Sequence, residues 1–148
     1  MATIAIASDH AGVALKAELV AELGKLGQLS LDLGPADTTS VDYPDFATKV
    51  TEAVVSKKAS LGVLICGTGI VMSITANKVH GIRAALCHTE FEARVTRQHN
   101  DANVLCLGAR VTGGGLAIEI LRAFLNASFE GGRHAARVEK INQVEAKR

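Results

Sequence analysis

The 148-residue sequence has few aromatic side chains, with one tyrosine, four phenylalanines and no tryptophan. Proteins that stack nucleobases or flavin rings use aromatic platforms, so this composition argues against both kinds of binding. An excess of one charge is also missing, because sixteen Lys and Arg residues are balanced by fifteen Asp and Glu residues. A general nucleic-acid or membrane-surface role needs a basic face, which this balance does not favour.

Disulfides and long apolar runs are absent from the pattern as well. Three cysteines, an odd number without CxxC spacing, do not form a disulfide framework and favour a reducing compartment. No segment approaches the ~20 apolar residues of a membrane span. The apolar run at the N-terminus reaches Asp9 too soon for a signal peptide. The sequence therefore predicts a cytoplasmic protein.

Short apolar segments alternate with segments of helical periodicity along the whole chain. We expect strands at 3–8, 29–33, 61–65, 82–87 and 104–107, and helices at 11–26, 45–57, 70–78, 89–98, 116–125 and 133–146. This alternation predicts a three-layer α/β/α, Rossmann-like fold with a five-stranded parallel sheet, helices on both faces and a C-terminal helix. The strands lack a polar face, as expected when both sides are covered. Without a linker or repeat, residues 1–148 form one domain.

The stretch from Leu61 to Ile74 carries the strongest chemical signal. A predicted strand ends in Cys66-Gly67-Thr68-Gly69 and continues into a helix. The backbone N–H groups and dipole of a helix start favour an anion, and the same field favours a thiolate. Cys66 beside the Thr68 hydroxyl therefore suggests a general base next to a developing oxyanion.

A structural interpretation of the cysteines stands beside this one, since free cysteine usually behaves as a small buried hydrophobe. It is the stronger interpretation for Cys87 and Cys106, which lie inside apolar runs. The glycine turn alone is a weak signal. No Gly-Lys-Ser/Thr follows it, and Met72 occupies the third glycine position of the dinucleotide fingerprint.

Two groups of polar residues accompany the predicted strand ends. Asp9 and His10 follow the first strand, at the edge of a parallel sheet where ligands bind, although Asp9 also suits a helix cap. His99 and Asn100 end the fourth helix, and we expect them to reach the same edge. A histidine that titrates near neutrality suits proton transfer, while a helix C-terminus also favours one for purely structural reasons.

Two arginines near the C-terminus share one helix face. Arg133 and Arg137 are spaced i, i+4, and two adjacent guanidinium groups form a natural clamp for phosphate. The alternative is a solvated basic face in which they pair with Glu130 or Glu139. The sequence alone leaves both interpretations open.

Taken in order, seven motifs resemble the type B ribose-5-phosphate isomerases, whose family also holds galactose-6-phosphate and allose-6-phosphate isomerases. The resemblance extends from Ile4 to about Ile141. The motifs are Ser8-Asp9-His10-Ala11-Gly12, Asp42-Tyr43-Pro44, Ile65-Cys66-Gly67-Thr68-Gly69-Ile70, Ala76-Asn77-Lys78, Gly81-Ile82-Arg83-Ala84, Arg97-Gln98-His99-Asn100-Asp101-Ala102-Asn103-Val104 and Glu130-Gly131-Gly132-Arg133-His134.

The resemblance implies an aldose–ketose isomerase that needs no metal and no cofactor, interconverting ribose 5-phosphate and ribulose 5-phosphate through an enediolate. Cys66 would be the base, assisted by Thr68, and His99, helped by Asp9, would open the furanose ring. The remaining substrate-binding positions would be Asp9, His10, Tyr43, Gly67, Thr68, Gly69, Ile70, Val71, Asn100, Arg110, Arg133 and Arg137. His10 and the three arginines among them would hold the phosphate, and backbone amides of Gly67–Val71 the oxyanion.

The resemblance also implies a homodimer or a dimer of dimers, since the family builds its site between two subunits and takes the last arginines from the partner. Some members use a carboxylate base, but Thr75 stands where they carry glutamate, which leaves Cys66. Val71 replaces the usual last glycine of the turn. A β-branched residue disfavours positive φ, so either the loop changes or the pocket narrows.

Three functions therefore remain open. The first is isomerisation of ribose 5-phosphate. The second is the same reaction on another sugar phosphate, such as erythrose, allose or galactose phosphate, since Val71 puts the sugar length in doubt. The third is a non-catalytic module that binds a sugar phosphate or a nucleotide.

Overall fold

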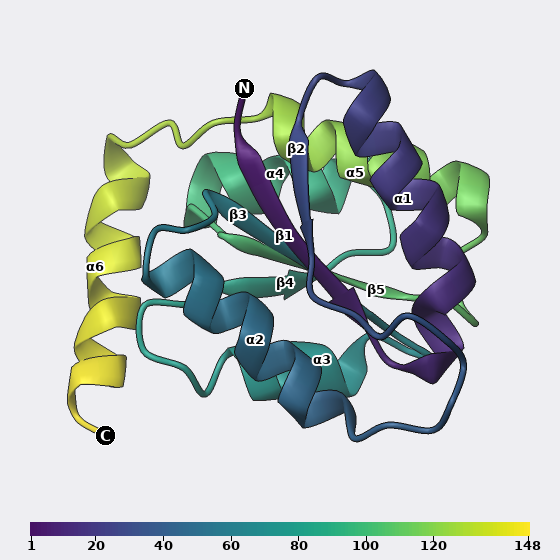
Figure 1. Ribbon diagram of the computed structural model, residues 1–148. Helices are drawn as coiled ribbons and strands as arrows, with labels where there is room; N and C mark the ends of the chain where they lie inside the picture. The colour runs from purple at the N-terminus through teal and green to yellow at the C-terminus, as the bar shows by residue number, and fades with distance from the viewer.

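A computed structural model describes residues 1–148, and it shows the predicted three-layer α/β/α fold (Figure 1). The strands β1 (Thr3–Ser8), β2 (Leu29–Asp32), β3 (Leu61–Cys66), β4 (Ala84–Leu86) and β5 (Val104–Gly108) all pair in parallel. Their order across the sheet is β2-β1-β3-β5-β4. The prediction of a five-stranded parallel sheet is confirmed.

Helices cover both faces of this sheet. They are α1 (Val13–Lys25), which follows a 3₁₀ turn at His10–Gly12, α2 (Tyr43–Val55), α3 (Ile70–Ala76), α4 (Glu90–Asn100), α5 (Gly114–Asn126) and α6 (Arg133–Ala146). One buried apolar cluster joins α1, α4 and α5 to the sheet, and a second joins α2 and α3 to its other face. None of the helices has the length and apolar composition that crossing a bilayer requires.

The predicted ends of several elements shift by a few residues. The helix expected at 45–57 begins at Tyr43 and ends at Val55, because Lys57 takes a left-handed conformation with φ 65°. The strand expected at 82–87 is limited to Ala84–Leu86, and the helix expected at 70–78 ends at Ala76.

The start of α4 follows the sequence closely. The Thr89 hydroxyl accepts a hydrogen bond from the Glu92 amide at 3.1 Å, and the Glu92 carboxylate accepts one from the Thr89 amide at 2.9 Å. This reciprocal capping box fixes the helix start at the end of β4. From there α4 runs back along the sheet to the beginning of β5, which determines where its last residues lie.

The C-terminal helix α6 lies beside the rest of the molecule, near the tails of the strand arrows (Figure 1). Only His134 and Val138 of this helix are buried. Two polar contacts hold its far half to the body: the Gly81 amide donates to Glu145 at 3.0 Å, and Arg83 donates to the Asn142 side chain at 3.4 Å. Most of the helix surface, with Arg133 and Arg137, is left exposed.

Candidate functional site

Cys66 ends β3 at the carboxyl edge of the sheet. The residue is 3% exposed, and its sulfur accepts a hydrogen bond from the Gly69 amide at 3.0 Å. The Thr68 hydroxyl accepts a second amide, that of Ile70, at 3.2 Å. The turn therefore places the Cys66 sulfur against a backbone N–H group just before α3, at the edge of the sheet where ligands bind in such folds.

Two glycines allow this turn to pack against its neighbours. Gly69 has φ 78°, and a Cβ there would lie 2.5 Å from Leu86 and 2.9 Å from the backbone of Leu107. Gly108 pairs in register with Cys66, and a Cβ there would lie 2.6 Å from the backbone carbonyl of Thr68. A side chain at either position would therefore displace the turn that carries Cys66.

Asp9 and His10 lie beside this turn, since the Asp9 amide donates to the Ile65 carbonyl at 3.0 Å. The Asp9 carboxylate caps the following turn, with one oxygen accepting the amides of Ala11 at 2.9 Å and Gly12 at 3.2 Å. The capping interpretation is thus confirmed, and it leaves the second carboxylate oxygen free of protein partners. Nδ1 of His10 is buried without a hydrogen-bond partner, a costly state that a ligand would relieve.

Arg110 and Tyr43 complete the polar residues at the carboxyl edge. The Arg110 amide donates to the Gly67 carbonyl at 2.9 Å, and its guanidinium lies over Gly67, 3.5 Å from where a Cβ would stand. Tyr43 is the first residue of α2, at the end of the loop that leaves the carboxyl end of β2, and is 38% exposed. With Asp9, His10, Cys66 and the turn to Val71, these residues form what we call the carboxyl-edge half.

Val71 is the second residue of α3 and takes an ordinary helical conformation. The positive φ of the turn belongs to Gly69, so a valine at 71 requires no change of the loop. Of the two consequences predicted for this substitution, the structure supports the added bulk beside the turn.

His99, Asn100, Arg133 and Arg137 lie at the opposite edge of the sheet, and we call them the amino-edge half. The helix α4 runs antiparallel to the strands, and its eleven residues carry the chain about 16 Å from the end of β4. The expectation that His99 and Asn100 reach the edge of Cys66 is therefore wrong within a single chain.

His99 stacks on His134, a residue to which the sequence assigned no role. The ring centroids are 4.1 Å apart and the planes differ by 9°. His134 is buried, with Nε2 3.9 Å from a carboxylate oxygen of Glu130. Burial lowers the pKa of His134, and the charges of His99 and Arg133 lower this pKa further, which favours a neutral ring. His134 lies between Arg133 and Arg137 in the sequence, and this position is the sequence feature that could have identified it.

His99, Glu130 and His134 also present ligand atoms within 4.8 Å of one another, the only such group in the chain. The lone pair of an imidazole nitrogen lies in the ring plane, and these two rings are stacked, with centroids 4.1 Å apart and planes 9° from parallel. A nitrogen of His99 and a nitrogen of His134 therefore cannot both point at one ion at the ~2.0 Å of a zinc–histidine bond. The arrangement suits stacking better than metal binding.

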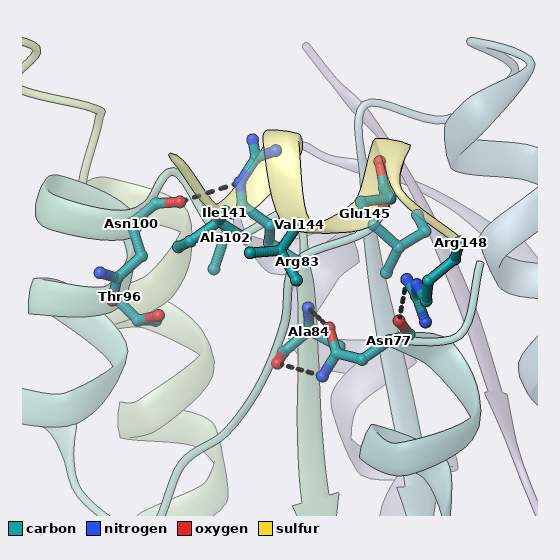
Figure 2. A pocket seen from close by; sticks show the side chains of 11 residues that line it. Asn77, Arg83, Ala84, Thr96, Asn100, Ala102, Ile141, Val144, Glu145 and Arg148 are labelled. Carbon is teal, nitrogen blue, oxygen red and sulfur yellow. Dashed lines mark hydrogen bonds between the residues drawn. The ribbon is translucent and has the colours of Figure 1, made fainter. Parts of the chain in front are cut away.

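Neither Arg133 nor Arg137 forms an ion pair within the chain, so the pairing with Glu130 or Glu139 is absent, although both arginines lie on a solvent-exposed face. A cavity of about 450 Å³ lies at the same edge, between α6 and the body (Figure 2). Asn100 lines this cavity together with Ile141 and Val144 of α6. Two unpaired cations thus lie on the helix that closes this cavity.

The other two cysteines are structural, as the sequence predicted. Cys106 is fully buried and Cys87 is 1% exposed. Burial, reinforced by the charge of Glu92, raises the pKa of Cys87 to about 12, and burial also raises the pKa of Cys106. Both side chains are therefore neutral thiols at physiological pH.

Comparison with known proteins identifies the family of the chain. The family model described as ribose/galactose isomerase matches residues 4–141. Ribose-5-phosphate isomerase B of Escherichia coli is 47% identical over 148 residues, covering 100% of this chain and 99% of that protein.

Solved structures of ribose-5-phosphate isomerases B have the same fold as this chain. Ribose-5-phosphate isomerase B of Clostridium thermocellum has a TM-score of 0.96 and 52% identity, covering 98% of each chain. The enzyme of Mycoplasma genitalium with bound ribulose-5-phosphate has a TM-score of 0.93 and 44% identity, covering 99% of this chain and 97% of that one. The chain therefore belongs to the ribose/galactose isomerase family.

Proposed function

We propose that the protein interconverts ribose 5-phosphate and ribulose 5-phosphate. The observation that carries this proposal is the Cys66 sulfur, which accepts the Gly69 amide at the start of α3. It stands at the sheet edge where ligands of such folds bind, in a chain 47% identical to a named ribose-5-phosphate isomerase B.

The chemistry assigns each group of the carboxyl-edge half a task. In the open-chain aldose, the Cys66 thiolate removes the proton from C2 while negative charge develops on O1. Backbone amides of the turn from Gly67 to Val71 stabilise this oxyanion, and Thr68 assists. A proton then passes from O2 to O1, and Cys66 returns its proton to C1, which yields the ketose. Asp9, His10, Tyr43 and Arg110 would bind and orient the substrate.

The amino-edge half would act on the same substrate from a second copy of the chain. His99 would open the furanose ring, Asn100 would bind sugar oxygens, and Arg133 with Arg137 would bind phosphate. Two observations support a shared site: these residues lie across the sheet from Cys66 within one chain, and both arginines lack an internal partner. We propose a homodimer, or a dimer of dimers, in which each copy completes the site of the other.

The length of the preferred sugar depends on Val71. Its side chain adds bulk beside the oxyanion turn without changing the backbone, which favours a short sugar. Another sugar phosphate is the second candidate. A non-catalytic binding module would not need the sulfur held by a backbone amide.

Three free thiols support the proposal of a reducing, cytoplasmic location.

The test is turnover of ribose 5-phosphate beside erythrose, allose and galactose phosphates, with wild type and Cys66→Ala. We expect fast turnover of ribose 5-phosphate that the variant loses by roughly 10³-fold or more, as for a base in direct contact with the substrate. Preference for another sugar would retain the mechanism and change the substrate. Activity retained in Cys66→Ala would refute the assignment of the base.

A further inference from the structure

The turn that follows His99 and Asn100 has an unusual backbone. Asp101 takes a left-handed conformation, with φ 47° and ψ 43°, at the end of α4. Lys57 is the other residue besides glycine with positive φ in the chain. Such a conformation costs free energy in any residue with a Cβ, so it persists where surrounding contacts enforce it.

Arg83, the residue before β4, supplies most of these contacts. Its Nε donates to the Asn100 carbonyl at 2.9 Å, as Figure 2 shows, and Nη2 donates to the Asp101 carbonyl at 2.9 Å. The same Nη2 lies 3.2 Å from the Asp101 carboxylate. Through Nη1 the guanidinium also reaches Asn142 of α6 at 3.4 Å. One side chain thus ties the turn after His99 to the helix that bears Arg133 and Arg137.

Arg97 holds the turn from the other side. Its Nη1 donates to the second carboxylate oxygen of Asp101 at 3.1 Å and to the Ala102 carbonyl at 2.6 Å. The side chains of Arg83 and Arg97 are only 18% and 14% exposed, while that of Asp101 is 38% exposed, so solvent screens these contacts in part. The Asp101 carboxylate therefore bridges two largely buried guanidinium groups, one oxygen to each.

We propose that Asp101 is a positioning residue for His99: its carboxylate, bridged by Arg83 and Arg97, fixes the turn that orients the histidine towards the substrate. This inference rests on the proposed function, in which His99 opens the sugar ring. Asp101 itself touches no reacting atom. A displacement of about 1 Å at a catalytic group costs roughly 10²-fold in rate, so the precision of this turn matters.

The test variant is Asp101→Gly, because glycine accepts the left-handed backbone and removes only the carboxylate. Asp101→Asn also tolerates this conformation but retains one acceptor oxygen, and should be intermediate. Lys57→Gly is the matched control, since it makes the same kind of change at the other left-handed residue. We expect Asp101→Gly to lower kcat for ribose 5-phosphate roughly tenfold to a hundredfold. Lys57→Gly should stay within about twofold of wild type.

A second comparison separates positioning from general destabilisation. In a His99→Asn background, Asp101→Gly should lower kcat by less than about twofold, because residues that act through one group are not additive. An equal loss in both backgrounds would overturn the proposal, as would wild-type kcat in Asp101→Gly. Full activity of His99→Asn would instead show that the assigned ring-opening residue is wrong, whereas the Cys66→Ala result tests the base independently.

Discussion

Replacing Gly108 with alanine is expected to disable the site through a single methyl group. Gly108 pairs with Cys66 across β3 and β5, and its added Cβ would lie 2.6 Å from both C and O of Thr68 and 2.9 Å from its Cα. All three contacts are with backbone, so no side-chain rotation relieves them. An ordinary contact begins near 3.4 Å, which requires the strand or the turn to move by the difference, 0.8 Å.

This movement displaces the Cys66 sulfur or the amides of its turn, and we expect kcat for ribose 5-phosphate to fall roughly 10²-fold. Overpacking should also lower the free energy of unfolding by about 1–3 kcal/mol. Kinetics and urea denaturation of Gly108→Ala measure both effects. Gly115→Ala is the matched control, because a Cβ there meets nothing within 4 Å. Wild-type kcat in Gly108→Ala would refute the claim that this glycine sets the geometry of the turn.

Two further predictions concern the neighbours of this turn. Val71→Gly should raise kcat/KM for allose 6-phosphate several-fold relative to ribose 5-phosphate, because it removes bulk without changing the loop; an unchanged ratio would exclude Val71 as a determinant of sugar length. The pKa of Cys87 is about 12 in the folded protein, above the 9.0 expected of the thiol in the unfolded chain. The protonated Cys87 thiol therefore contributes fully to the free energy of unfolding below pH 9, and this contribution is lost as the pH rises towards 12. The urea midpoint of wild type should therefore fall more steeply above about pH 9 than that of Cys87→Ala, and parallel curves would contradict this.

Local signals in the sequence were sufficient for most of the fold. Unbroken apolar runs predicted the buried strands β1, β3 and β5, whereas the edge strand β2 is mostly exposed. The helix expected at 89–98 begins where Thr89 and Glu92 form a capping box. The order β2-β1-β3-β5-β4 was not predictable, because contacts between distant segments decide which strands become neighbours. The left-handed backbone at Lys57 ends α2 earlier than predicted, and no glycine in the sequence indicates this conformation.

In the candidate site, too, local features were predictable from the sequence and contacts between distant segments were not. The glycine turn identified the surroundings of Cys66, since a strand, a tight turn and a helix follow one another in the chain. The prediction that His99 lies at the carboxyl edge is wrong because α4 runs antiparallel to the strands. Its last residues therefore lie at the amino ends of the strands. The stacking of His134 on His99 joins two separate helices, α4 and α6, and periodicity within either helix does not reveal it.

The most direct test of a site shared between two copies is to mix two inactive variants, one from each half. Cys66→Ala and His99→Asn would be purified separately, then unfolded and refolded together. Random pairing gives hybrid dimers with one site free of both changes, so activity should recover to about a quarter of the wild-type level. Activity that stays at the level of the separate variants, although hybrids form, would contradict the account and place Cys66 and His99 in the site of one chain.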